Sequence, residues 1–175
     1  MDEINNNLVQ NNSENFAIKA KSPEESSAEV IVRMFPSDAN PAGNVFGGEI
    51  LKHIDMVAGI VAQRHSQSNA VTVSMDSVNF IKPVFVGNVL KLNARINYVH
   101  NSSMEVEVKA EAEDIVTGIK TVTGTAFVTF VGLDKNGKPK CVPKLLLKTD
   151  EDRTKFAEGK IRMENRLKHR KKSNI

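Results

Sequence analysis

One stretch, Ser37–His65, constrains the fold of this chain more than any other. Its first part, SDANPAGN, is rich in Asp, Asn, Pro and Gly, which are the residues that favour turns. From Phe46 or Gly47 to about His65, apolar residues then recur three and four positions apart. They are Ile50, Leu51, Ile54, Val57, Ala58, Val61 and Ala62. This spacing predicts a long amphipathic helix with one broad face buried against another layer.

The chain around this helix has the two-residue period of β-strands. Turn residues separate the strand-like segments; one such turn is His100-Asn101-Ser102, between two alternating runs. One run is expected to place Leu90, Leu92, Ala94, Ile96 and Tyr98 on the same side of a sheet. The order of one strand, one helix and four strands predicts an α+β fold, with the helix across a mostly antiparallel sheet. The predicted strands are 28–35, 70–80, 89–99, 104–112 and 119–133.

A length of 175 residues fits one domain with extra segments at its ends. Residues 1–26 are polar and Asn-rich and are expected to form a flexible arm, residues 27–147 the domain, and residues 148–175 a charged helical tail. No apolar run approaches the length of a membrane span, and the beginning has no hydrophobic signal core, so neither stable membrane insertion nor secretion is expected. The single cysteine, Cys141, fits a reducing compartment, and a cytoplasmic location is expected.

The net charge of +3 is unevenly distributed. Residues 1–29 hold six acids and two lysines, a balance of −4, and residues 155–175 hold eight Lys or Arg and two Glu, a balance of +6. Such a basic tail can bind nucleic acid, an anionic membrane or cofactor phosphates. Because it lacks the interleaving of basic and aromatic residues that single-strand binders use, the favoured interpretation is a solvated, partly frayed helix, with no nucleic-acid partner.

Two features of the predicted helix point to chemistry. Asp55 lies at the border of the apolar face, beside Ala58, Gly59 and Ala62, whose small side chains leave space next to the carboxylate. The Gly-Gly pair at the helix start leaves backbone N–H groups uncovered, so that a polarised carbonyl could approach them. A base two turns from such donors suggests hydrolysis of a carbonyl compound.

Several motifs follow one another in a fixed order: PSDANPAGNVFGGEILKHIDMVAGIVAQRH, VTVSMDSVNFIKPVFVGNVLKL, NSSMEVEVKAEAED and TAFVTFVGLDKNGKP. Together they resemble those of a known family, the hotdog-fold acyl-CoA thioesterases of the cytosolic acyl-CoA hydrolase type. The resemblance runs from about Glu29 to Val142. A lone Gly-Gly pair or a lone helical Asp would be weak grounds, but this series of motifs at consistent spacings is specific.

The resemblance implies a fold in which the sheet wraps the long helix, and an activity that hydrolyses acyl-CoA to free fatty acid and CoA. It implies that two subunits join their sheets edge to edge, that active sites lie at the dimer interface, and that dimers commonly form a trimer of dimers. Coenzyme A is then part of substrate and product. No separate cofactor is expected, and the four histidines lack the grouped spacing of a zinc site.

By the resemblance, the catalytic acid is Asp55 and its partner from the facing subunit is Asn40. The carboxylate can activate water or attack the carbonyl itself, and the sequence does not separate these routes. The N–H of Gly48 is the expected oxyanion donor, with Gly47 beside it. Asn44 also precedes the helix, and it is expected to cap the helix or to support the site locally.

Coenzyme A phosphates require cations, and Arg64 and Lys82 lie in segments that look like the family. One alternative is a regulatory hotdog module that binds acyl-CoA without cleaving it; the acidic residues 1–26 do not look like the DNA-binding segment that such regulators carry. A second alternative is a dehydratase of acyl thioesters, which needs a His on the helix or its entry loop, and no His occupies such a place.

Overall fold

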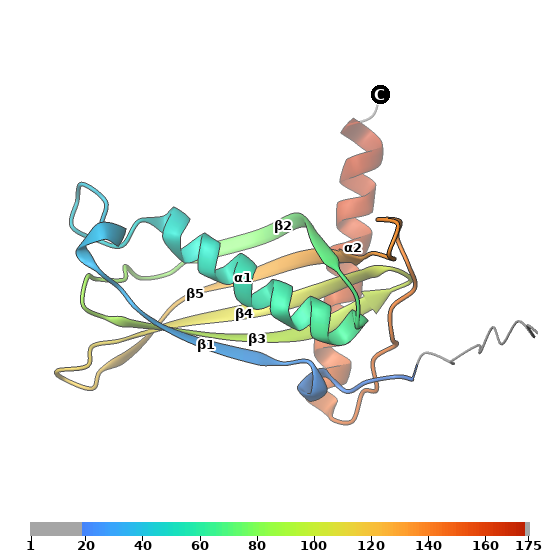
Figure 1. The fold of residues 1–175 in the computed structure, drawn as a ribbon, viewed down its shortest axis with the longest axis horizontal. Coiled ribbons are helices and arrows are strands. Elements are labelled where there is room, and N and C mark those ends of the chain that lie inside the picture. The colour runs from blue at the N-terminus through green and yellow to red at the C-terminus, as the bar shows by residue number, and fades with distance from the viewer. Residues whose placement is uncertain (1–18, 174–175) are drawn as a thin grey trace, which may run out of the picture.

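The computed structural model describes residues 19–173, and the expected α+β class is confirmed. The first half contains the short 3-10 helices η1 (Pro23–Glu25) and η2 (Pro36–Asp38), strand β1 (Ala28–Arg33) and helix α1 (Gly47–Ser66). The remaining elements are β2 (Ala70–Phe80), β3 (Val89–His100), β4 (Ser103–Glu113), β5 (Lys120–Gly132) and α2 (Asp150–Ser173) (Figure 1). The predicted helix and strands therefore form where the periodicity placed them.

The five strands form one sheet in the order β1-β3-β4-β5-β2, and every neighbouring pair is antiparallel. Strand β2 is therefore an edge strand, although it follows α1 directly in the chain. Strands β3, β4 and β5 are joined by short turns and form the centre of the sheet, with β1 at the other edge (Figure 1).

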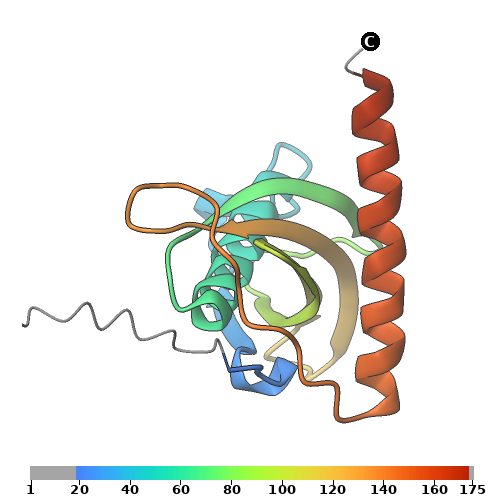
Figure 2. The ribbon, with the colours of Figure 1, turned by 90° about the vertical axis from the view of Figure 1, so that its right-hand side faces the viewer.

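Helix α1 lies along the inner, concave face of the sheet (Figure 2). Its apolar stripe meets the inward side chains of the central strands, which alternate with outward polar ones as the two-residue period requires. The fully buried part of this core includes Val57, Ala58, Val61, Leu90, Leu92, Ile96, Val106, Val108 and Val128. This packing holds α1 in one position against the strands, so that the polar residues at its border are fixed relative to β2.

The expected orientation of Tyr98 is wrong. The register of β3 with β4 shifts between Ile96 and Tyr98, as at a β-bulge, and such a shift sends the following side chain to the opposite face. Tyr98 packs outside the inner core, with its ring centroid 4.8 Å from that of Phe156 on α2.

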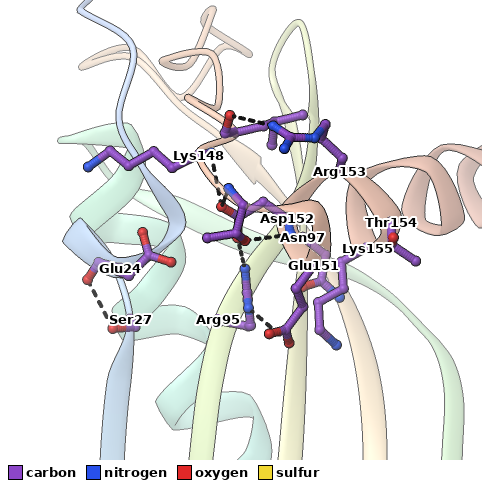
Figure 3. Close-up of polar contacts among 12 residues, drawn as sticks. Glu24, Ser27, Arg95, Asn97, Lys148, Glu151, Asp152, Arg153, Thr154 and Lys155 are labelled. Atoms are coloured by element: carbon purple, nitrogen blue, oxygen red, sulfur yellow. Dashed lines mark hydrogen bonds and ion pairs between the residues drawn. The ribbon is translucent and has the colours of Figure 1, made fainter.

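Helix α2 crosses the outer face of the sheet roughly at right angles to the strands (Figures 1 and 2). Near its start, the Thr149 hydroxyl accepts a hydrogen bond from the Asp152 N–H and so caps the helix, while the Asp152 carboxylate accepts hydrogen bonds from the backbone N–H groups of Lys148 and Thr149. The same carboxylate pairs with Arg95 on β3 at 2.6 Å (Figure 3). Further along the helix, Lys155 pairs with Glu107 at 2.6 Å.

These contacts correct the expectation of a solvated, frayed tail, at least for the part of α2 that lies on the sheet. The side chains of Glu105 and Glu107 on β4 are only 2% and 7% exposed, beneath the helix. Arg162 pairs with Glu105 at 2.8 Å and lies 3.9 Å from the centroid of the Phe127 ring. The cations of the tail thus neutralise carboxylates that would otherwise be buried alone.

The predicted N-terminal arm lies largely outside the described residues, which begin at residue 19. Its last part packs against the domain, unlike a loose arm. Lys21 pairs in parallel with Leu145, and Ser22 and Ser26 are buried. Ser26 also contacts the ring of the buried His65 at 3.1 Å, and the other ring nitrogen of His65 lies 2.8 Å from the Pro143 carbonyl.

Candidate active site

Asp55 projects from the middle of α1 toward the edge strand β2. The hydroxyl of Thr72 donates a hydrogen bond of 2.7 Å to its Oδ1 atom, and the Asp55 side chain is partly exposed. One carboxylate oxygen is thereby fixed in place, whereas for the other no hydrogen-bond partner is found among residues 19–173. A carboxylate held by one oxygen and open at the other is suited to act as a base or a nucleophile.

The start of α1 offers the backbone donors that the Gly-Gly pair predicts. The backbone N–H groups of Glu49 and Ile50 both reach the Phe46 carbonyl, whereas no acceptor for those of Gly47 and Gly48 is found among residues 19–173. The N-cap residue is Phe46, and it makes no side-chain capping hydrogen bond. The expectation that Asn44 caps the helix is therefore wrong, and the two glycine donors stay open to a ligand.

The turn before α1 is organised by Asn40. Its side-chain oxygen accepts hydrogen bonds from the backbone N–H groups of Ala42 at 2.9 Å and Asn44 at 3.2 Å. Its backbone N–H donates to the Asn44 carbonyl at 2.7 Å, and Gly43 closes the turn with a φ of +82°. Because the oxygen is used within the turn, the amide nitrogen of Asn40 is the part of the side chain available to a ligand.

A pocket of about 330 Å³ lies between this turn, the start of α1 and the end of β2. Four of the predicted site residues line it: Asn40, Asn44, Gly47 and Lys82. Ile50 and Phe80 supply apolar walls. The structure therefore brings together the amide, the helix N-terminus and one predicted cation in a space that has both polar and apolar surfaces.

Asp55 does not line this pocket. It lies eight residues beyond Gly47 on α1, which corresponds to about 12 Å along the helix axis. Arg64 lies still farther along, where its guanidinium donates a 2.7 Å hydrogen bond to the Ser27 carbonyl beside β1. Within one copy of the chain, the predicted base and the predicted CoA-binding cation Arg64 are thus separate from the pocket that holds Asn40.

Sequence reasoning missed two residues of this region. Thr72 orients Asp55, and the Phe80 ring lies 3.6 Å from the position that a Cβ atom on Gly47 would take. Both belong to β2, which the sequence describes only as an alternating strand. The one available signal for Thr72 was its place between Val71 and Val73, near the start of the strand. Within residues 19–173, no group of three or more His, Cys, Asp or Glu could hold a metal ion, and no helix is long and apolar enough to cross a membrane.

Comparison with known proteins gives a consistent result. Residues 42–119 match the sequence profile of the Thioesterase superfamily. An uncharacterized acyl-CoA thioester hydrolase of Bacillus subtilis (strain 168) is 42% identical over 129 residues, which span 74% of this chain and 75% of the relative. This chain belongs to the thioesterase superfamily. The hotdog fold implied by the sequence motifs is confirmed.

Other members of the superfamily extend this comparison. The cytosolic acyl coenzyme A thioester hydrolase of Mus musculus is 39% identical over 139 residues, but these residues span only 36% of the mouse protein. Among solved thioesterases, an apo-hexameric acyl-CoA thioesterase superposes with a TM-score of 0.83 at 36% identity, over 87% of this chain and 97% of that one. The Staphylococcus aureus acyl-CoA hydrolase, solved with butyryl coenzyme A and coenzyme A, gives 0.82 at 35% identity, over 89% and 94%.

Proposed function

We infer that this protein is an acyl-CoA thioesterase, which hydrolyses acyl-CoA to free fatty acid and CoA, and that its active site is completed by a second copy of the chain. The observation that carries the inference is the anchored carboxylate of Asp55 on the β2 side of α1. The open N–H groups of Gly47 and Gly48 supply the complementary donors at the helix start. The relatives named above as acyl-CoA thioester hydrolases support the reaction class.

The arrangement of α1 and β2 explains why two copies are needed. The two elements run in opposite directions, so that Asp55 lies beside Thr72 near the start of β2 and Gly47 lies beside Phe80 at its end. Thr72 and Phe80 are equally far from Asp76 in the strand. If two β2 strands pair antiparallel about a two-fold axis near Asp76, Thr72 of one copy faces Phe80 of the other. Asp55 then faces the pocket of Asn40 in the second copy.

Exposed apolar side chains support pairing along this edge. Val71 and Val73 on β2 are 40% and 54% exposed, and Met56 and Ile60 on the neighbouring face of α1 are also exposed. An open strand edge with such side chains favours association with another chain. Hexameric thioesterases among the structural relatives support an oligomer. The pairing about β2, and the further assembly into a trimer of dimers, are part of the proposal.

The spacing of three residues supports the assignment of the site. The S. aureus acyl-CoA hydrolase has been solved as three variants in which alanine replaces an aspartate, an asparagine or a threonine. In that protein the asparagine precedes the aspartate by 15 residues (43 − 28), and the threonine follows it by 17 (60 − 43). In this chain Asn40 precedes Asp55 by 15 residues and Thr72 follows Asp55 by 17. The three residues recur as a set at identical spacings.

In the proposed mechanism, Asp55 takes a proton from a water molecule while the water oxygen attacks the thioester carbonyl carbon. The carbonyl oxygen becomes negatively charged and accepts a hydrogen bond from the Gly48 N–H, which can lower the barrier by about 3 kcal/mol. The C–S bond then breaks, the carboxylic acid forms, and the CoA sulfur leaves with the electron pair and takes the proton from Asp55, which restores the carboxylate. The Asn40 amide of the second copy holds the water or the carbonyl. Attack by the carboxylate itself, through an anhydride, uses the same residues.

The remaining assignments concern substrate binding and location. Lys82 lines the pocket and is proposed to bind a CoA phosphate, whereas Arg64 could reach the same ligand only from another copy, because it lies near β1. No separate cofactor is required by this mechanism. A cytoplasmic location is proposed from the single cysteine and from the cytosolic mouse relative.

The test of the function is release of thiol from acyl-CoA substrates of several chain lengths. Asp55→Asn should lower the rate by at least about 100-fold, because the base is lost while the shape is kept. Lys52→Gln, at an exposed position of the same helix that does not line the pocket, is the matched control and should keep the wild-type rate. Wild-type protein that binds acyl-CoA but releases no thiol would instead establish the regulatory module, and an Asp55→Asn variant with normal turnover would refute the role of Asp55.

A further inference from the structure

The contacts of α2 follow the order of the strands in the sheet. Asp152 pairs with Arg95 on β3, Lys155 pairs with Glu107 on β4, and Arg162 lies over β4 and β5. The last of these contacts is an ion pair between Arg166 and Asp76 on β2. The helix therefore spans the sheet from β3 to its edge strand, and it meets that edge strand at Asp76.

Helix α2 does not end at the sheet edge. It continues for seven residues beyond Arg166, from Leu167 to Ser173, which corresponds to about 10 Å. Figures 1 and 2 show this part of the helix projecting past β2. Since neighbouring strands are about 4.8 Å apart, the projection is long enough to cover two further strands.

Leu167, the first residue of this projecting end, is more exposed than the apolar residues of α2 that pack against the sheet. Leu167 follows Phe156 and Met163 at spacings of eleven and four residues, so it continues the same flank of the helix. Phe156 packs on Tyr98, and Met163 is only 8% exposed, whereas Leu167, the next apolar residue along this flank, is 46% exposed. Leu167 is therefore an apolar side chain that is left half exposed at the point where the helix passes the edge of the molecule's own sheet.

We propose that the end of α2, Leu167–Ser173, is an interface between two copies of this chain and lies over the outer face of the second copy's sheet. The proposal rests on the two-copy site argued above, in which the two-fold axis passes near Asp76. Because Arg166 of α2 also meets β2 at Asp76, the two α2 helices then come side by side, in opposite directions, across this axis. Leu167 is the first residue past the axis and packs against the second copy.

The two carboxylates of Asp76 also come near each other at this axis. Like charges at short distance repel, and the Arg166 cation of each copy offsets this repulsion. The basic character of the tail, which the sequence left without a partner, thus serves the seam between the copies as well as the buried carboxylates of the sheet.

The test compares Leu167→Asp with Ile161→Asp by sedimentation over a dilution series. Ile161 is the matched control, because it is 57% exposed on the same helix but on the side away from the sheet. Leu167→Asp should raise the concentration of half-dissociation by about tenfold or more, since a charge enters a buried apolar contact in both copies. Ile161→Asp should change it by less than about twofold. Equal effects of the two substitutions would overturn the proposal.

A measurement on the wild-type protein is independent of any folding defect in the variants. Backbone amides of residues 167–173 should exchange with deuterium more slowly in the assembled protein than in the dissociated one; equal exchange would also overturn the proposal. Thiol release separates this proposal from the proposed function. If the protein hydrolyses acyl-CoA but Leu167→Asp does not affect assembly, only the proposed interface is refuted. If Leu167→Asp weakens assembly specifically but the protein does not hydrolyse acyl-CoA, only the proposed activity is refuted.

Discussion

Asn40 has a structural role in its turn and a proposed role in binding the ligand, and a single substitution can separate the two. Its side-chain oxygen holds the turn through the N–H groups of Ala42 and Asn44, and its amide nitrogen is left for the ligand. The turn needs an acceptor at this position and the proposed chemistry needs a donor. A carboxylate preserves the first requirement and removes the second.

Asn40→Asp should therefore fold and assemble like the wild type, with thiol release from acyl-CoA lowered by about 100-fold. Circular dichroism and sedimentation check the fold and the assembly, and a thiol reagent checks the rate. Asn136→Asp is the control, since Asn136 is exposed in another turn, lies outside the pocket, and hydrogen-bonds there through its backbone N–H rather than its side chain. Wild-type turnover in Asn40→Asp would show that the amide donor is not used.

At the scale of single elements, α2 depends on one glycine for its close approach to the sheet. A Cβ atom on Gly159 would lie 2.6 Å from the Tyr98 Cβ and 2.9 Å from a carboxylate oxygen of Glu105. Glycine in the middle of a helix normally costs about 1 kcal/mol relative to alanine, so its presence here is explained by packing rather than by helix propensity.

Gly159→Ala should consequently reverse the usual effect of this substitution. The free energy of unfolding should fall by about 1–3 kcal/mol, because the helix must move away from β3 and β4 and strain its buried ion pairs. Chemical denaturation measures the change. Lys160→Ala, at the exposed neighbouring position, should leave the stability within about 0.5 kcal/mol of the wild type. A stabilised Gly159→Ala variant would mean that α2 is not held closely against the sheet.

The positions of the helix and strands could be predicted from the sequence, but the contacts between them could be predicted less well. Periodicity placed α1 and the strands because apolar residues recur three and four positions apart in α1 and largely alternate with polar ones in the strands. The orientation of Tyr98 was wrong because a β-bulge depends on the pairing of β3 with β4 and leaves no mark in an alternating sequence. The packing of α2 was missed because Glu105 and Glu107, its buried partners, lie far from the basic tail in the chain.

At the scale of the whole molecule, two buried groups couple stability to pH. Burial lowers the pKa of His65 from 6.5, although its contact with the Pro143 carbonyl opposes this change and Lys21 and Glu25 lie close to it. Burial raises the pKa of Asp152, but hydrogen bonds from Thr149 and Arg95 outweigh this effect, and the pKa falls to about 2. Both groups therefore bind protons more readily in the unfolded chain than in the folded one.

Because the unfolded state takes up the extra protons, the free energy of unfolding should fall as the pH falls. The His65 contribution is complete above pH 6.5 and is lost below it, at a rate of up to about 1.4 kcal/mol per pH unit. The Asp152 contribution is lost in a separate window, from pH 3.8 down to about 2. Urea denaturation at a series of pH values measures both contributions. In the His65→Gln variant, the free energy of unfolding should depend less on pH in the first window only. An unchanged pH dependence in that window would show that His65 is not buried in its neutral form.

The sequence by itself determined the α+β class and the positions of the helix and strands, and it supplied the candidate residues of the site, because these follow from local periodicity, turn chemistry and recurring motifs. Only the tertiary structure decided that β2 lies at the sheet edge, that Thr72 holds Asp55, and that the pocket of Asn40 is separate from Asp55 within one copy. The physical reason is that hydrogen bonds and ion pairs between distant segments depend on which faces and edges the packed core brings together, and no local pattern records that choice.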